Sequence, residues 1–218
     1  MIISLSNKKI SVHLQYKSKS TIAYIKGFQF IFVYVNCYFM TSPIMENNKY
    51  SLKSIISDKL INKEIKEICL LKDKHWKFGI KSQLKWFKNN VKKYDLHNLF
   101  HIKSKLVGYT LLRKRTFEIK SLNKKTQYLL FDTLVIDKNH RGMKLSNLLM
   151  NFNNTIIKQS GFSSFLICND ELVDFYKKNN WKILNKKFFN IADHDFSSNA
   201  MIFNESNIYK KFTFYINK

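Results

Sequence analysis

The sequence predicts a single α+β domain in which helices are layered on a mixed β-sheet. The predicted elements follow the order β-α-α-β-β-β-α-β-α-β-β, so helices and strands are neither fully segregated nor strictly alternating. The 218 residues are 45% hydrophobic and 15% aromatic, which is enough to bury the core of one domain. One proline and five glycines exclude collagen-like and Pro/Gly-rich low-complexity chains.

The N-terminal half of this domain predicts one strand, two helices and a hairpin. In the first helix apolar residues recur at helical spacing, and an aspartate stands at its N-cap position. Two apolar runs that flank a short polar turn predict the hairpin. In chain order the segments are a strand at 50–56, a helix that begins after Asp58, a shorter helix at 82–92, and hairpin strands at 98–102 and 106–113.

The C-terminal half places a buried strand before a helix twice in succession. The run 127–136 is apolar at nearly every position, so we expect it to be central and buried on both faces. A polar turn leads into an amphipathic helix at 144–160. A second strand, 163–168, precedes a helix capped by Asn169 or Asp170. The remaining strands are predicted at 181–184, 200–203 and 212–216, with a polar loop at 190–198.

The first 44 residues differ in composition from the rest of the chain. Residues 1–40 contain no Asp or Glu, and 28–40 is a nearly continuous apolar run. This run is too short to span a bilayer as a helix, which takes about 20 residues, and no clean signal-peptide cleavage site follows it. We expect residues 1–44 to lie outside the domain, as a disordered extension or a mis-assigned start, and the domain to span 45–218. A membrane-touching N-terminal anchor is the alternative.

The chain is strongly basic. Lysine and arginine total 38 against 15 aspartates and glutamates, which gives a formal charge of +23. A basic face can bind nucleic acid by neutralising phosphates and releasing counterions. However, 35 of these residues are lysines spread along the chain, and arginine, which makes bidentate base and phosphate contacts, occurs only three times. A solvated lysine surface is therefore favoured over a nucleic-acid partner.

The spacing of cysteines and histidines argues against disulfides and metals. The three cysteines show no paired spacing, which excludes a disulfide framework and a cysteine-rich zinc site. The histidines show no metal-ligand spacing either. We therefore expect a reducing, cytoplasmic environment and no bound metal. We also expect no transmembrane span, and a monomer or homodimer.

One strand, one polar turn and one helix follow each other without interruption. The buried strand ends at 134–136, the turn contains Arg141 and Gly142, and the helix begins at once. A strand-to-helix turn of this kind directs several free backbone N–H groups at one spot, where the helix dipole favours an anion. The segment predicts a cradle for a pyrophosphate that needs no metal. Residues 163–181 repeat this order, with a buried strand followed directly by a helix.

These two units resemble the GNAT N-acetyltransferase family. The stretch LVIDKNHRGMKLSNLLM (134–150) is similar to that family's acetyl-CoA motif, and NDELVDFYKKNNW (169–181) is similar to its second motif. The segment VGY (107–109) resembles the family's strand with a glycine between hydrophobic residues. The resemblance covers roughly residues 48–185. It implies a GNAT-like fold, with a mixed, mostly antiparallel central sheet flanked by helices and splayed at its two central parallel strands.

The resemblance implies an N-acetyltransferase that moves an acetyl group from acetyl-CoA to a primary amine of a small acceptor by direct attack. The main chain at the end of the strand would pair with the pantetheine arm, and the backbone amides of 141–146 would hold the pyrophosphate. The residues that the resemblance assigns to acetyl-CoA are Leu134, Val135, Ile136, Arg141, Gly142, Met143, Lys144, Leu145, Ser146 and Asn169.

Three positions depart from the family pattern. Lys144 stands where the family has glycine, Ser146 where it has glycine or alanine, and Asn180 where it has glycine. A side chain at position 144 costs about 1 kcal/mol if φ is positive, and an ammonium beside the pyrophosphate can offset that cost. Retained coenzyme binding is favoured. The alternative is a GNAT-fold protein with weakened coenzyme binding that acts as a basic binding module for nucleic acid or anionic ligands.

Two residues are candidates for proton transfer. By resemblance, Tyr176 protonates the departing thiolate, a role that suits a phenol with a pKa of about 10. Asp132 lies two residues before Leu134 on the same face of the buried strand, where a carboxylate with a raised pKa can act as a general base. The alternatives are that Tyr176 packs its helix on the sheet and that Asp132 pairs with a lysine or a backbone amide.

We expect the acceptor to bind where the first two helices meet the splayed strands. The candidates are His75, Trp76, Phe78 and Trp86. The two tryptophans and the phenylalanine can form an aromatic wall for a sugar or another flat ligand. Packing in the core is the alternative for these residues. The positive charge favours an anionic acceptor, such as a nucleotide-linked amino sugar. A different acyl-CoA is the alternative donor.

Overall fold

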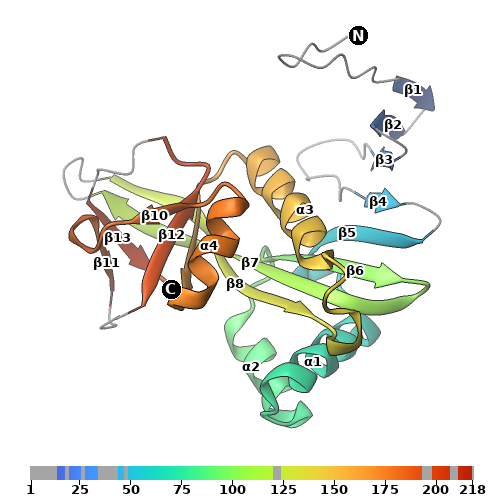
Figure 1. The fold of residues 1–218 in the computed structure, drawn as a ribbon, viewed down its shortest axis with the longest axis horizontal. Coiled ribbons are helices and arrows are strands. Elements are labelled where there is room, and N and C mark those ends of the chain that lie inside the picture. The colour runs from blue at the N-terminus through green and yellow to red at the C-terminus, as the bar shows by residue number, and fades with distance from the viewer. Residues whose placement is uncertain are drawn as a thin grey trace.

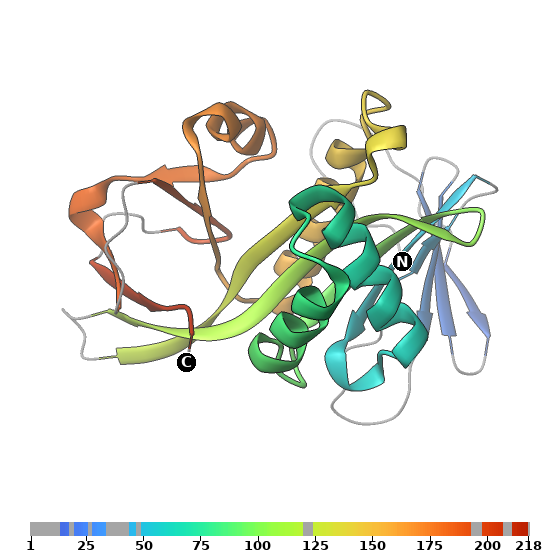
Figure 2. The same cartoon turned by 90° about the horizontal axis from the view of Figure 1, so that it is seen from below.

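A sheet of 13 strands forms the centre of the described structure. This computed structural model describes residues 14–17, 20–25, 28–33, 44–46, 49–119, 124–192, 198–206 and 211–217. Helices α1 (Asn62–Trp76) and α2 (Ile80–Asn90) lie on one face of the sheet, and α3 (Leu145–Ser160) lies on the other (Figure 1, Figure 2). Helix α4 (Asp170–Lys178) packs beside the C-terminal strands. The predicted α+β class is confirmed.

The sheet is mostly antiparallel, as predicted. The strand order is β1-β2-β3-β4-β5-β6-β7-β8-β9-β12-β10, and β13 pairs with both β7 and β11. Within the described strands, only the pairs β8 with β9 and β11 with β13 are parallel. The strands are β1 (Leu14–Lys17), β2 (Ser20–Ile25), β3 (Phe28–Val33), β4 (Ile44–Glu46), β5 (Tyr50–Ile56), β6 (Leu96–Ile102), β7 (Lys105–Ile119), β8 (Lys124–Ile136), β9 (Ser164–Cys168), β10 (Lys182–Leu184), β11 (Phe189–Ile191), β12 (Asn199–Phe203) and β13 (Phe212–Tyr215).

Strands β1 to β4 continue the sheet from its β5 edge. Strand β4 pairs antiparallel with β5, placing Ile44 opposite Lys53, and β1 to β3 follow as further antiparallel neighbours. The other residues of the expected 1–44 extension lie outside the described residues, and its separation from the domain stays a prediction. No helix in the described ranges is long and apolar enough to cross a membrane.

The first helix begins later than predicted. Asp58 lies in a 3-10 turn before the helix, and Ile61 occupies the N-cap position instead. The carboxylate of Glu64 accepts a hydrogen bond from the N–H of Ile61 at 3.1 Å. This bond satisfies a backbone donor at the helix entrance, so a glutamate inside the helix replaces the aspartate cap that the sequence predicted.

The C-terminal region contains a strand where the sequence predicted a loop. Strand β11 overlaps the start of the predicted loop at 190–198 and pairs in parallel with β13, placing Phe189 opposite Phe212. Three residues are too few to show the alternation that marks a strand. Residues 193–197 of that predicted loop lie outside the described residues.

Apolar clusters cover both faces of the central strands. One packs α3 against the sheet and includes Leu149 and Phe131. The other packs α1 and α2 against the sheet and includes Ile68, Tyr109 and Val135. Because β8 contributes Phe131 to one cluster and Val135 to the other, the prediction of a central strand buried on both faces is confirmed.

The two central parallel strands separate soon after they meet. Strand β8 pairs with β9 only at Leu129 opposite Ser164 and Leu130 opposite Phe165. On its other edge β8 stays paired with β7 as far as Ile136, with an irregularity beside Leu112 that leaves Asp132 without an opposite residue. This is the predicted splay, and it leaves the β9-facing edge of β8 unpaired beyond Leu130.

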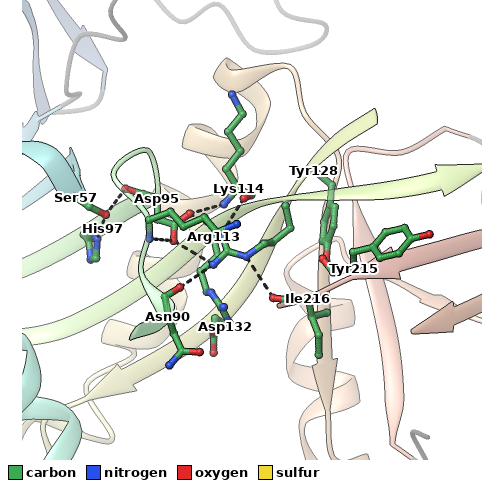
Figure 3. Close-up of polar contacts among 12 residues, drawn as sticks. Ser57, Asn90, Asp95, His97, Arg113, Lys114, Tyr128, Asp132, Tyr215 and Ile216 are labelled. Atoms are coloured by element: carbon green, nitrogen blue, oxygen red, sulfur yellow. Dashed lines mark hydrogen bonds and ion pairs between the residues drawn. The ribbon is translucent and has the colours of Figure 1, made fainter. Parts of the chain in front are cut away.

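A buried ion pair joins four segments of the chain (Figure 3). The carboxylate of Asp95, at the start of β6, accepts a hydrogen bond from Arg115 Nη1 of β7 at 2.9 Å, and neither side chain is exposed. The same guanidinium donates to the carbonyl of Asn90 at the end of α2, at 2.8 Å, and to that of Ile216 after β13, at 3.3 Å. The backbone N–H of Lys114 donates to Asp95 as well, at 2.8 Å.

A chain of polar contacts extends from this ion pair into the core. Ser57 Oγ donates to the carbonyl of Asp95 at 3.1 Å and lies 2.7 Å from His97 Nε2. His97 Nδ1 lies 2.8 Å from the hydroxyl of Tyr109. Burial, with a smaller contribution from Lys72, lowers the pKa of His97 to about 3. The imidazole is therefore neutral, so Tyr109 donates to Nδ1 while Nε2 donates to Ser57.

Helix α3 begins in a left-handed backbone conformation. Lys144, at the N-cap, has φ 57° and ψ 18°. Gly142, in the preceding turn, has φ 80°. In this region of φ/ψ space a Cβ costs about 1 kcal/mol, whereas glycine pays no such cost. The strain anticipated for a lysine at this position is therefore present.

Asp95→Ala should destabilise the fold by about 3–5 kcal/mol, because it leaves the Arg115 guanidinium buried without its carboxylate. The measurement is the free energy of unfolding from urea titration. Asp174→Ala is the matched control, since that side chain is 84% exposed and pairs only loosely with Lys177, and it should change stability by less than about 0.5 kcal/mol. Equal effects of the two substitutions would contradict the role of the ion pair.

Lys144→Gly should stabilise the free protein by about 1 kcal/mol, because it removes the Cβ from a left-handed residue. Lys138→Gly is the control, since Lys138 lies in a 3-10 turn with no positive φ, where glycine should cost about 0.5–1 kcal/mol. Thermal unfolding of both variants measures the difference. A loss of stability in Lys144→Gly would show that the lysine side chain makes contacts worth more than the strain.

Candidate active site

Two pockets adjoin along strand β8. The first, which we call the aromatic pocket, has a volume of about 420 Å³ and is lined by Lys72, Trp76, Phe78, Ser82, Gln83, Trp86, Asp132 and Thr133. The second, which we call the α3 pocket, has a volume of about 300 Å³ and is lined by His75, Leu134, Val135, Ile136, His140, Arg141, Gly142, Lys144, Leu145, Ser146, Leu172 and Phe175. Thr133 lines the first and Leu134 the second, so the two pockets begin at neighbouring positions along β8.

The floor of the α3 pocket is the unpaired edge of β8. The N–H of Asp137 donates to the carbonyl of Val107 at 2.7 Å. Along an antiparallel ladder the direction of the main-chain groups alternates, so those of Ile136 and Leu134 point away from β7. They face the gap that opens where β8 leaves β9. An extended ligand with amide groups can form main-chain hydrogen bonds there, as an added strand would.

Asp137 organises the turn between β8 and α3. Its buried carboxylate accepts hydrogen bonds from the N–H of Asn139 at 3.0 Å and from Lys74 Nζ at 3.3 Å, and it lies 3.5 Å from His140 Nδ1. Burial raises its pKa, but the bonds from Asn139 and Lys74 outweigh that effect and leave the pKa lowered. The ionised carboxylate therefore holds the turn that presents Arg141 to the pocket.

The start of α3 supplies free hydrogen-bond donors. None of the backbone N–H groups of residues 142–146 donates to another group within the described part of the chain. The 16-residue helix behind them adds its dipole. The side chains of Arg141 and Lys144 line the same pocket and add positive charge. Free N–H groups, dipole and cations all favour an anion at this end of the pocket.

His75 lines the α3 pocket rather than the aromatic pocket. Its Nδ1 lies 2.8 Å from Arg141 Nη2. Arginine can only donate, so Nδ1 accepts and the imidazole is neutral. Partial burial and then the charge of Arg141 lower the pKa of His75. The contact holds the guanidinium at the pocket, while the His75 ring also lies 4.6 Å from that of Trp76. A role of His75 in acceptor binding stays a prediction.

Trp76 and Trp86 form the wall of the aromatic pocket, and a buried lysine lies between them. The Nζ of Lys72 lies 3.6 Å from the centroid of the Trp86 ring and 5.9 Å from that of Trp76. Phe78, at the rim, is 69% exposed. These three aromatic residues line the pocket, and Trp76 and Trp86 also pack against the apolar cluster of α1 and α2. Their role in acceptor binding stays a prediction.

Asp132 lies in the aromatic pocket and is held by an ion pair. Its Oδ2 accepts a hydrogen bond from Arg113 Nη1 at 2.7 Å. The partner is an arginine on the neighbouring strand, not the lysine or backbone amide considered from the sequence. Asp132 lines the aromatic pocket beside Thr133, whereas Leu134 lines the α3 pocket. The prediction of a buried carboxylate that shares a face with Leu134 is therefore wrong, because the irregularity of β8 falls at Asp132 and its side chain is 22% exposed.

Tyr176 is buried between the diverging strands and does not line either pocket. Only 6% of the residue is exposed, and its ring contacts those of Phe131, at 6.1 Å between centroids, and Trp181, also at 6.1 Å. Burial, with a smaller contribution from Cys168, raises the pKa of its hydroxyl. Its neighbour Phe175 lines the α3 pocket and also packs against the apolar cluster beneath α3.

The remaining coenzyme candidates divide into two groups. Most of them line the α3 pocket together, namely Leu134, Val135, Ile136, Arg141, Gly142, Lys144, Leu145 and Ser146. Met143 and Asn169 are not among its lining residues. Met143 is 60% exposed. Asn169 is the N-cap residue of α4, as predicted, but its side chain makes no capping hydrogen bond.

Several lining residues were missed from the sequence. Lys72 and Gln83 in the aromatic pocket lie in no motif. His140 and Leu172 in the α3 pocket lie within the motifs at 134–150 and 169–181, but the sequence analysis gave them no role. For Lys72 a signal did exist, because it precedes Trp76 by one helical turn and so shares its face of α1. Among the described residues, no group of three or more His, Cys, Asp or Glu side chains could hold a metal ion.

Comparison with known proteins supports the fold. No family model matches the sequence, and no curated protein matches it. An acyl-CoA N-acyltransferase from Pseudomonas aeruginosa has a TM-score of 0.52 at 12% identity, over 70% of this chain and 98% of that one. The GNAT family N-acetyltransferase YhbS from Escherichia coli, in complex with CoA, has a TM-score of 0.53 at 11% identity, over 72% and 82%.

A third solved structure, of an aminoglycoside 6'-N-acetyltransferase complexed with coenzyme A, has a TM-score of 0.50 at 14% identity, over 68% of this chain and 94% of that one. In each comparison the match spans more than four fifths of the other chain and about seven tenths of this one. This chain therefore has the fold of the GNAT N-acetyltransferases. Within that fold, the parallel strands β8 and β9 separate beside the start of α3.

Proposed function

We propose that this chain is a member of the GNAT family that transfers an acetyl group from acetyl-CoA to a primary amine of a small acceptor. The observation that carries the proposal is the α3 pocket, which combines an unpaired strand edge with a cluster of free N–H groups. Acetyl-CoA matches both features. The amides of its pantetheine arm can pair with the strand edge, and its anionic pyrophosphate can accept hydrogen bonds from the N–H groups. The adjoining aromatic pocket leaves room for the acceptor.

In this proposal the coenzyme lies along the α3 pocket. The main-chain groups of Leu134 and Ile136 pair with the pantetheine arm, while Val135 packs in the core beneath them. The N–H groups of residues 142–146 hold the pyrophosphate, so Met143 contributes through its backbone. Arg141, positioned by His75, and Lys144 supply charge that complements the phosphates.

The acetyl group would then lie where the two pockets meet, beside Asp132 and Thr133. The neutral amine attacks the thioester carbonyl, the C–S bond breaks, and the thiolate leaves. Asp132 Oδ2 is taken by Arg113, which leaves Oδ1 to accept a proton from the amine, directly or through water. Tyr176 is proposed to protonate the thiolate. Its burial in the gap between β8 and β9 and its raised pKa keep the phenol protonated until then.

Acetyl-CoA should raise the melting temperature of the protein, and a 100-fold excess over Kd should stabilise it by about 2.7 kcal/mol. Ser146→Asp should abolish the shift, because it places a negative charge at the proposed pyrophosphate site. The free variant should remain stable, since aspartate suits the first turn of a helix. Asn151→Asp, at an exposed position on the same helix, is the control and should keep the shift.

The absence of any shift at millimolar acetyl-CoA would contradict the proposal. If wild-type protein then bound nucleic acid in a salt-sensitive way, the basic binding module would be the better description. The strained Lys144 is the observation that favours that second function, because a Cβ there limits how closely a pyrophosphate can approach the backbone.

Tyr176→Phe should lower kcat by about 10²–10⁴, because it removes the proton donor of the leaving thiolate. The Kd for acetyl-CoA should not change, since the hydroxyl makes no contact with the proposed binding groups. Release of free CoA thiol measures the rate. Tyr94→Phe, at a 51% exposed tyrosine, is the matched control. Wild-type kcat in Tyr176→Phe would leave Tyr176 with a packing role alone.

A further inference from the structure

The aromatic pocket contains a cation that has no counterion. Lys72 is only 6% exposed, yet it takes part in none of the ion pairs within the described ranges. Its Nζ is held over the face of Trp86 instead. Burial lowers the pKa of Lys72, and the negative charge of Asp132 only partly offsets this effect. Burying an ammonium without an anionic partner is costly.

The neighbouring carboxylate does not serve as that partner. Asp132 is bound by Arg113 at 2.7 Å, and this guanidinium also approaches the Trp86 ring, at 5.7 Å from its centroid. Lys72 and Arg113 together carry two positive charges near the pocket against the single negative charge of Asp132. One positive charge is therefore left over, and it lies on the lysine.

A second unpaired donor lines the same pocket. Gln83, on α2, is 4% exposed, and its Nε2 is buried without a hydrogen-bond partner among the described groups. Gln83 and Lys72 face the pocket from two helices that pack against each other. A buried amide donor is ordinarily satisfied. A ligand that brings an anionic oxygen into this pocket would satisfy the amide and neutralise the ammonium at once.

We infer that the acceptor carries a carboxylate beside its amine, and that Lys72 and Gln83 bind this carboxylate in the aromatic pocket. The inference rests on the proposed function and names the acceptor class for the same site. Asp132, which lines the same pocket, takes the amine end, while Trp76 and Trp86 enclose the rest of the acceptor. A monoanion matches the single excess charge, whereas a phosphate dianion would exceed it and be repelled by Asp132.

The test compares amines with and without a carboxylate. The pairs are phenylalanine with phenethylamine, histidine with histamine, and lysine with cadaverine. Acceptor-dependent release of CoA thiol gives kcat/KM, and thermal shift in the presence of CoA gives binding. In wild-type protein at least one carboxylate-bearing member should exceed its partner by about tenfold or more, as expected for a charge-assisted hydrogen bond.

Lys72→Met should reduce the preference for the carboxylate-bearing amine to about twofold or less, because methionine has a side chain of similar length but no charge. Gln83→Met should reduce it by a smaller factor. Lys63→Met is the matched control, since Lys63 is exposed on the same helix, and it should keep the full preference. A preference that persists in Lys72→Met, or equal activity with both members of every pair in wild-type protein, would overturn the inference.

The binding of acetyl-CoA separates this inference from the proposed function. If wild-type protein binds acetyl-CoA but shows no preference for carboxylates, the acceptor class is wrong and the proposed transfer stands. If acetyl-CoA does not bind, the proposed function fails first. Lys72→Met should bind acetyl-CoA as tightly as wild-type protein, because Lys72 does not line the α3 pocket. Retained binding would also show that the variant is folded.

Discussion

The buried ion pair of Asp95 and Arg115 is the contact on which the arrangement of sheet and helices depends. Its two charges are fully enclosed, so the groups around them must be present together to compensate for lost water. These groups come from β6, β7, the end of α2 and the segment after β13. Because the contact to Asn90 fixes where α2 ends, it also fixes how α2 places Gln83 and Trp86 over β8.

The site uses polar groups that the fold leaves unpaired. Strand β8 leaves β9 after a short contact, and the rings of Phe131, Tyr176 and Trp181 fill the gap near that point. Beyond it the edge of β8 and the start of α3 present main-chain groups to the same pocket. Unpaired backbone groups are costly in a protein interior, and here they are concentrated where a ligand can satisfy them.

The strong positive charge of the chain has little to do with its arginines. Arg115 pairs with Asp95, Arg113 pairs with Asp132, and Arg141 contacts His75 at the α3 pocket. The other positively charged residues are lysines. Most of those described are exposed, and Lys72 and Lys144 line the aromatic pocket and the α3 pocket. The charge that matters for ligands is therefore local.

The sequence by itself determined the elements and the local motif from 134 to 150, because strand alternation, helical spacing and a polar turn are properties of neighbouring residues. The left-handed strain at Lys144 followed from the same motif. Only the tertiary structure decided that His75 meets Arg141, 66 residues away, and that Asp132 meets Arg113 across an irregular strand pair. It also decided that Lys72 and Gln83 face one pocket. Such partners depend on strand register and helix packing, which bring together residues whose own neighbours in the chain carry no sign of the contact.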